Sequence, residues 1–167
     1  MRLFQPAKRE YTLKSDRIGL MTGAGGWLQP FLDFTSRLSR EEAGRVMKGE
    51  FRVFSRTLIT EGGRMPDWHL DVLNGHRFEK APSRKVRIND IRNADCLFPC
   101  ELSRLQFLLP LCSSSGNPAE DSAVDSFVKE VIDDWTEENP MGTGIHWRMH
   151  MESALRALSV VSALPFL

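Results

Sequence analysis

The sequence feature that most restricts the fold of this chain is a pair of amphipathic helices near its C-terminal end. The first is signalled by Asn117 as an N-cap, Pro118 at the first helical position and Glu120 three residues beyond the cap. The apolar residues that follow recur at the spacing of one helix face. These are Val124, Phe127, Val128, Val131, Ile132 and Trp135. We therefore predict a long helix with one apolar stripe.

The second helix follows a short bend, "NPMGTG", which contains proline and glycine. It begins near Trp147 and carries Glu152 and Arg156 at i and i+4 on its polar side, where they are placed to form an ion pair. Its apolar side consists of Met151, Ala154, Leu155, Leu158 and Val161. Because helices joined by a short connection pack antiparallel, we predict a mainly α fold that contains antiparallel helix hairpins.

The chain before these helices is less regular. Residues 1–40 carry no clear pattern and are treated as a poorly defined segment. Ser39 followed by Glu41–Glu42 predicts a short helix that ends near Gly49. Residues 50–59 are rich in β-branched and aromatic side chains, which predicts an extended segment.

Turn-forming residues recur between residues 60 and 93, which predicts a long ordered loop. Helical periodicity returns over residues 98–112, with Pro99 in the first turn, where proline is tolerated. The predicted domain therefore spans residues 41–167.

The charge balance excludes a general nucleic-acid-binding protein. The chain has 22 Lys plus Arg and 22 Asp plus Glu among 167 residues, whereas nucleic-acid binders usually carry a basic surplus. A local basic group does exist at Arg84, Lys85 and Arg87. It would suit a polyanionic glycan, and a solvated run of charge explains it equally well.

No metal or other cofactor is predicted. The three cysteines, Cys96, Cys100 and Cys112, do not form the paired pattern that a zinc site needs, which favours reduced structural thiols. His146 and His150 share a helix face at i and i+4, but no third ligand follows at a suitable spacing.

No membrane span or export signal is predicted either. The longest uncharged run, residues 18–32, is short and is interrupted by glycine and proline. Charged residues come before it, where a signal peptide would place its apolar region. We therefore expect a cytoplasmic location by default.

Four segments of the chain, taken in order, bear a family likeness: "GEFRVFSRTL" (Gly49–Leu58), "DWHLDVLNGHRF" (Asp67–Phe78), "PCELSRLQFLLPL" (Pro99–Leu111) and "NPMGTGIHWRMHMESALRAL" (Asn139–Leu158). They resemble conserved segments of the heparinase II/III family of polysaccharide lyases and lyase-like proteins. The second is similar to the family's Asp-Trp-His-x-Asp-Pro-x-x-Gly loop, and the third to its Trp-Glu-Leu-x-Arg-x-Gln helix. The fourth resembles its Asn-Pro-Pro-x-x-Gly-Ile-Asn-Trp segment. The resemblance covers about residues 44–163.

The resemblance implies that residues 41–167 are the first part of an N-terminal α/α toroid, apparently truncated. It also implies an acidic, uronate-containing polysaccharide as the partner, which the family cleaves by β-elimination, often in the periplasm. Three positions depart from the family pattern. Cys100 replaces the usual Trp, Val72 replaces Pro, and His146 replaces the Asn that neutralises the uronate carboxylate.

Two further observations limit an enzymatic interpretation. The family's catalytic tyrosine lies further along the toroid and its histidine lies on a later β-sandwich domain, whereas the one tyrosine of this chain is Tyr11. The last residues, Leu158–Leu167, are strongly apolar. We expect them to need a downstream domain or a partner that covers them.

His146 is the candidate catalytic residue. β-Elimination removes the proton next to the uronate carboxyl, and this requires a group that neutralises the carboxylate as well as a base and an acid. An imidazolium at His146 would pair with the carboxylate in a pH-dependent way. The alternative is that His146 only caps the start of the last helix.

The candidate substrate-binding residues are Trp68, His69, Asp71, Glu101, Arg104 and Trp147. Each also has a structural interpretation. The two tryptophans could stack on sugar rings, but Trp147 also fits a core position and Trp68 a contact with its adjoining loop. Glu101 and Arg104 lie one helical turn apart and could pair with each other rather than line a groove.

Three hypotheses follow. The chain is a part of a polysaccharide lyase that is not catalytic by itself, a non-catalytic carbohydrate-binding or assembly protein of polysaccharide metabolism (including a decayed gene product), or an unrelated helical interaction protein. The four ordered matches favour the first two.

Overall fold

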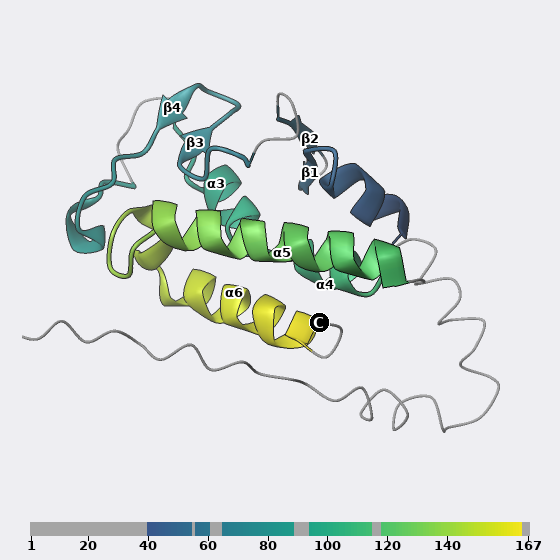
Figure 1. Ribbon diagram of the computed structural model, residues 1–167. Coiled ribbons are helices and arrows are strands. Elements are labelled where there is room, and N and C mark those ends of the chain that lie inside the picture. Colours follow the sequence, from purple (N-terminus) through teal and green to yellow (C-terminus); the bar gives the residue numbers. More distant parts are fainter. Residues whose placement is uncertain (1–39, 55, 61–64, 89–93, 115–117, 165–167) are drawn as a thin grey trace, which may run out of the picture.

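The computed structural model describes residues 40–54, 56–60, 65–88, 94–114 and 118–164, with side chains of the long helix from residue 122 onward. The segment 1–39, the predicted N-caps Ser39 and Asn117, and Tyr11 lie outside the described residues. The described part of the chain is mainly α, as predicted. Its helices pack in layers beneath two small antiparallel hairpins (Figure 1).

The two long helices are α5 (Pro118–Glu138) and α6 (His150–Ala163), which run antiparallel as the sequence predicted (Figure 1). The apolar stripe of α5 faces the core: Val124, Val128, Val131 and Trp135 are buried. The apolar face predicted for α6 is the reverse of the one observed. Leu158 and Val161 are 63% and 61% exposed, whereas Glu152 and Arg156 are buried.

A β-hairpin follows a short helix at the start of the described part of the chain. Helical residues 40–46 lead into β1 (Glu50–Val53), which pairs with β2 (Arg56–Ile59) in an antiparallel register that places Phe51 opposite Leu58. The short helix before Gly49 is therefore confirmed, but the extended segment folds back on itself. The chain turns at Phe54, whose φ of 55° lies in the left-handed region.

The predicted long loop is ordered by two short elements. β3 (Leu70–Asp71) and β4 (His76–Arg77) form a second hairpin around the turn at Gly75, and a 3-10 turn, η3, spans Ser83–Lys85. A further 3-10 turn, η4 (Ile145–Trp147), precedes α6.

The helix predicted over residues 98–112 is instead two short helices. These are α3 (Leu97–Leu102) and α4 (Leu108–Cys112), and Leu105 between them has a φ of 55°. A continuous helix would need an N–H at Pro110, which proline lacks. Ending one helix and starting another places Pro110 in a first turn, where no N–H is required.

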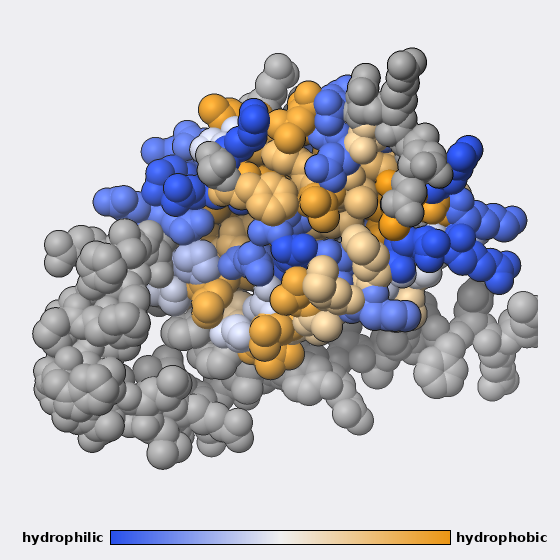
Figure 2. All heavy atoms as spheres, turned by 180° about the vertical axis from the view of Figure 1, so that it is seen from behind, coloured by the Kyte–Doolittle hydropathy of each residue, from blue (hydrophilic) through white to orange (hydrophobic). Residues whose placement is uncertain are grey.

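The main core lies between the β1–β2 hairpin, α4 and α5. Its fully buried side chains include Phe51, Val53, Trp68, Leu108, Leu111 and Val131. A smaller cluster of Phe78, Val86, Cys100 and Ile145 lies under the turns that lead to α6. On the face opposite to that of Figure 1, hydrophobic side chains gather toward the centre and most hydrophilic ones lie around them (Figure 2).

Candidate functional site

The second, third and fourth family-like segments meet in a buried polar cluster, together with Trp135 of α5. The rings of His69 and His146 lie 5.0 Å apart between centroids, and Trp135 lies 6.5 Å from His146. The Ser103 hydroxyl joins them, because it accepts a hydrogen bond from Trp135 Nε1 at 3.1 Å and lies 3.3 Å from His146 Nε2. Residues far apart in the sequence are thus held together by one network.

His146, the candidate catalytic residue, is completely enclosed, with 0% of its surface exposed. Burial lowers the pKa of His146 to about 3, with smaller contributions from His69 and Arg156, while the nearby carbonyl of Trp68 opposes the shift. At neutral pH the ring is therefore uncharged and out of reach of a substrate. Nor does it cap α6, whose N-cap, Met149, makes no side-chain capping bond.

Arg156 is buried against two tryptophans. Its guanidinium lies 4.2 Å from the ring centroid of Trp135 and 4.9 Å from that of Trp147, in cation–π contact. It donates hydrogen bonds to the carbonyls of Ser103 at 3.2 Å and His146 at 3.1 Å. Burial lowers the pKa of Arg156 to about 10, so that it remains charged at neutral pH. The side chain fixes α6 against α5.

Glu152 is paired with Arg104 and not with Arg156. Its carboxylate accepts hydrogen bonds from Arg104 Nε at 2.7 Å and Nη2 at 2.9 Å, in the two-pronged geometry that suits a guanidinium. The same guanidinium also forms an ion pair with Glu101. Glu101 and Arg104 therefore pair with each other, which is the structural interpretation of these two residues. The hydrogen bond to Glu152 raises the pKa of Arg104.

Trp68, His69 and Asp71 hold the β3–β4 hairpin on the protein. Trp68 is buried and donates from Nε1 to Asp134 of α5 at 2.6 Å. Burial lowers the pKa of His69, whose Nε2 lies 3.4 Å from the carbonyl of Glu138. These side chains face the interior and not a groove.

Asp71 shapes the hairpin itself. Its carboxylate accepts hydrogen bonds from the backbone of Leu73 at 3.0 Å and Asp95 at 2.9 Å, and from the Asn74 side chain at 2.8 Å. Burial would raise the pKa of Asp71, but these hydrogen bonds outweigh it and lower the pKa. The carboxylate is thus fully used in local structure.

An open pocket lies beside the buried cluster, between η3 and the start of α6. It has a volume of about 430 Å³ and is lined by Pro82, Ser83, Arg84, Gly142, Trp147, Arg148 and His150. The two sides are joined by backbone hydrogen bonds, from Ser83 to Gly142 at 2.8 Å and from Gly144 to Ala81 at 2.8 Å. No carboxylate belongs to this lining, so its fixed charges are cationic.

Trp147 connects the pocket with the cluster. Its Nε1 donates to the carbonyl of Asn139 at 3.0 Å, and its ring packs 5.9 Å from that of Trp135. The indole is only partly buried and also lines the pocket. Of the predicted substrate-binding residues, Trp147 is the one that borders this pocket.

Sequence reasoning missed Ser83, Arg148 and His150. The Ser83 hydroxyl is buried and makes no hydrogen bond within the described part of the chain. Arg84 had been noted for its charge. Arg148 and His150 follow Trp147 within three positions in the fourth family-like segment, and this proximity to an aromatic residue was the available signal.

The comparisons with known proteins gave no match, whether with protein-family models, with curated proteins or with solved structures. Among the described residues, no helix is both long and apolar enough to cross a membrane. The same residues contain no cluster of three His, Cys, Asp or Glu side chains that could hold a metal ion.

Gly144 brings the bend into contact with His69. Its φ is 77° and its ψ −175°, a conformation nearly restricted to glycine, and a Cβ at this position would lie 2.7 Å from His69 Cε1. We expect Gly144→Ala to lower the free energy of unfolding by about 2–3 kcal/mol, measured by urea denaturation. Gly142→Ala has the same φ with open space around it, and its loss should be smaller. Equal losses would contradict the role of the His69 contact.

Proposed function

We propose that this chain binds an acidic, uronate-containing polysaccharide and does not cleave it by itself. In this proposal it is part of an α/α toroid similar to that of the heparinase II/III family. The observation that carries the proposal is the pocket at η3 and α6, whose lining combines Arg84, Arg148 and His150 with the indole of Trp147. The contacts among the second, third and fourth family-like segments support the same origin.

The chemistry of the pocket suits a sugar acid. A guanidinium binds a carboxylate or sulfate through two parallel hydrogen bonds, and an aromatic face provides a flat apolar wall for the ring. The volume of about 430 Å³ is within the usual range for small-molecule sites. Because the bordering guanidinium groups are exposed, an anionic group can reach them without a rearrangement of the fold.

The same residues do not supply the groups for β-elimination. Arginine stays protonated and cannot act as the base. His146, at the position of the family's carboxylate-neutralising residue, is enclosed and uncharged at neutral pH. We therefore assign His146, His69, Trp68 and Asp71 to the support of the pocket.

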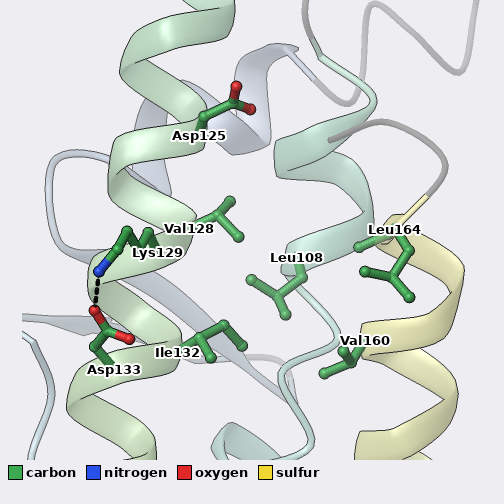
Figure 3. Close-up of a pocket in the computed structure, with 9 residues that line it drawn as sticks. Leu108, Asp125, Val128, Lys129, Ile132, Asp133, Val160 and Leu164 are labelled. Atoms are coloured by element: carbon green, nitrogen blue, oxygen red, sulfur yellow. Dashed lines mark hydrogen bonds and ion pairs between the residues drawn. The ribbon is translucent and has the colours of Figure 1, made fainter. Parts of the chain in front are cut away.

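A second candidate is an assembly role in polysaccharide metabolism, and the outer surface of α6 favours it. Besides the exposed Leu158 and Val161, an apolar groove of about 440 Å³ lies between α5 and α6 (Figure 3). Val128 and Ile132 of α5 point toward Leu108 and Val160 across this groove (Figure 3). A further domain or a partner would cover this surface.

Binding can be measured by titration calorimetry with a uronate oligosaccharide. We expect Arg148→Gln and Arg84→Gln each to weaken binding about tenfold or more, because each removes a hydrogen bond to a charged group. Arg45→Gln, on an exposed residue of the first helix, should leave binding unchanged. A neutral glucan should bind much more weakly than the acidic ligand.

Equal binding by the native chain and both pocket variants would place the ligand outside this pocket. If the native chain did not bind the oligosaccharide at all, the binding proposal would fail and the assembly role would be the remaining candidate. The same mixtures should show no ultraviolet absorbance from unsaturated uronate. Its appearance would contradict the non-catalytic part of the proposal without affecting the binding part.

A further inference from the structure

The groove between α5 and α6 has the surface of a helix-binding site. Its floor and walls are apolar side chains from three helices, namely Leu108, Val128, Ile132, Val160 and Leu164 (Figure 3). Its charged lining residues recur at every fourth position of α5 and so form one edge, at Asp125, Lys129 and Asp133. A groove that is apolar along its length and charged along one edge suits an amphipathic helix.

The described part of the chain begins beside this groove. Arg40 opens the first helix, which lies against the beginning of α5 (Figure 1), and it lines a small hollow together with Ala123 and Val124. The next residue of α5, Asp125, already lines the groove, at the same end as Leu164 (Figure 3). The 39 residues that precede Arg40 therefore join the described part at one end of the groove.

The sequence just before Arg40 carries side chains that match an apolar groove. Phe31, Phe34 and Leu38 are spaced at i, i+3 and i+7, which is the spacing of one helix face. The charged residues of this stretch, Asp33 and Arg37, fall on the opposite face of such a helix. Each phenylalanine that docks in a groove can bury about 150–250 Å² of surface.

We propose that residues 30–38 of the same chain dock in the groove between α5 and α6 as a short amphipathic helix, with Phe31 and Phe34 against the apolar walls. The lengths agree. The edge from Asp125 to Asp133 corresponds to about 12 Å of helix, and the stretch from Phe31 to Leu38 to about 10 Å.

The covalent connection favours this segment over any other occupant. A single residue, Ser39, separates Leu38 from Arg40. A binding segment held on so short a connection has an effective concentration on the order of millimolar, so it docks before a second copy or a separate partner does. The inference does not depend on the polysaccharide ligand. It leaves the outer face of α6, with Leu158 and Val161, to the assembly role.

Photochemical cross-linking of the full chain tests this contact. Phe31 is replaced by p-benzoylphenylalanine, whose benzophenone bonds to nearby C–H groups on illumination, and trypsin releases it in the peptide 18–37. The walls of the groove fall in the peptides 105–129, 130–148 and 157–167. We expect fragmentation of the cross-linked pairs to locate the bonds at groove residues such as Ile132 and Val160. Absence of cross-links to groove residues would overturn the proposal.

Isotope labelling distinguishes the chain's own segment from that of a second copy. Isotopically heavy and light chains, both with the photoreactive residue, are mixed in equal amounts and equilibrated before illumination. We expect each cross-linked pair of peptides to be wholly heavy or wholly light. Pairs that join one heavy and one light peptide would show that a second copy fills the groove, and they would refute docking within the chain.

Two variants of exposed leucines on α6 test whether the groove itself is the docking site. Leu164→Glu places a carboxylate at the end of the groove, and we expect the yield of cross-links at Ile132 and Val160 to fall about tenfold, because an unpaired charge is costly to bury. Leu158→Glu makes the same change outside the groove and should leave this yield unchanged. Equal yields in the two variants would contradict docking in the groove.

Discussion

Replacing Arg104 by methionine is expected to lower the free energy of unfolding by about 3–5 kcal/mol. The reason is the position of Glu152, whose side chain is 1% exposed and receives two hydrogen bonds from the Arg104 guanidinium. Without Arg104 this carboxylate would stay buried and lose its ion-pair partner, because Arg156 interacts with it only at longer range. Urea denaturation followed by circular dichroism measures the change.

A double variant tests whether the loss comes from the unpaired charge. Arg104→Met combined with Glu152→Met removes both charges, and it should recover most of the stability lost in the single variant. Lys129→Met is the matched control, since its pair with Asp133 is exposed and should contribute at most about 0.5 kcal/mol. If Arg104→Met lowered the free energy of unfolding by only about 0.5 kcal/mol, Glu152 would not depend on Arg104 for its stability in the buried position.

Lowering the pH from about 6.5 to about 4 is expected to lower the free energy of unfolding by roughly 3 kcal/mol through His146 alone. The folded pKa of about 3 lies below the ordinary histidine value of 6.5, so the unfolded chain binds the proton first. The stabilisation is therefore complete above about pH 6.5 and is lost progressively as the pH falls toward 3. His69, whose pKa burial also lowers, acts in the same direction.

The variant His146→Gln tests this dependence, because glutamine keeps a polar group near Ser103 but cannot take up a proton. We expect its stability to change much less between pH 6.5 and 4 than that of the native chain. His150 is exposed, so His150→Gln should keep the native pH dependence. If the free energy of unfolding of His146→Gln changed with pH as much as that of the native chain, His146 would not be the source of the pH dependence, whatever the absolute stability of the variant.

Local rules predicted α5 well because all the information lies within the helix. Its apolar stripe, including Val128 and Val131, is buried, and the helix ends at Glu138, just before Asn139–Pro140. The break between α3 and α4 was missed, although the proline at position 110 was a local signal against one continuous helix. The turn at Phe54 was missed because neither Phe54 nor its neighbours belong to the residue types that usually mark a hairpin turn.

The face of α6 could not be predicted from the helix alone. The usual rule places charged residues outward because an unpaired charge is costly to bury. Here Arg104, the partner of Glu152, is 48 positions away in the sequence. The carbonyl of Ser103, which accepts a hydrogen bond from Arg156, is 53 positions away. A single sequence does not reveal such partners, so the rule gave the wrong side.

Single residues of the candidate pocket could be predicted from the sequence, but their arrangement could not, again because it depends on long-range contacts. Arg84 was noted for its charge and Trp147 for its ring, but their proximity depends on the hydrogen bond between Ser83 and Gly142, which joins segments almost sixty residues apart. The substrate-binding assignments of Trp68, His69 and Asp71 rested on the resemblance. The structure uses these side chains to attach a hairpin.

The inward charges of α6 also determine how the helix can be seated. Turning it by one residue, about 100°, would withdraw Glu152 from Arg104 and Arg156 from the two tryptophans, leaving both charges without their partners. Sliding it by one turn would have the same effect. Apolar side chains tolerate such displacements far better, because their contacts have little directionality. The contacts of Glu152 and Arg156 therefore restrict α6 to a single rotational and axial position.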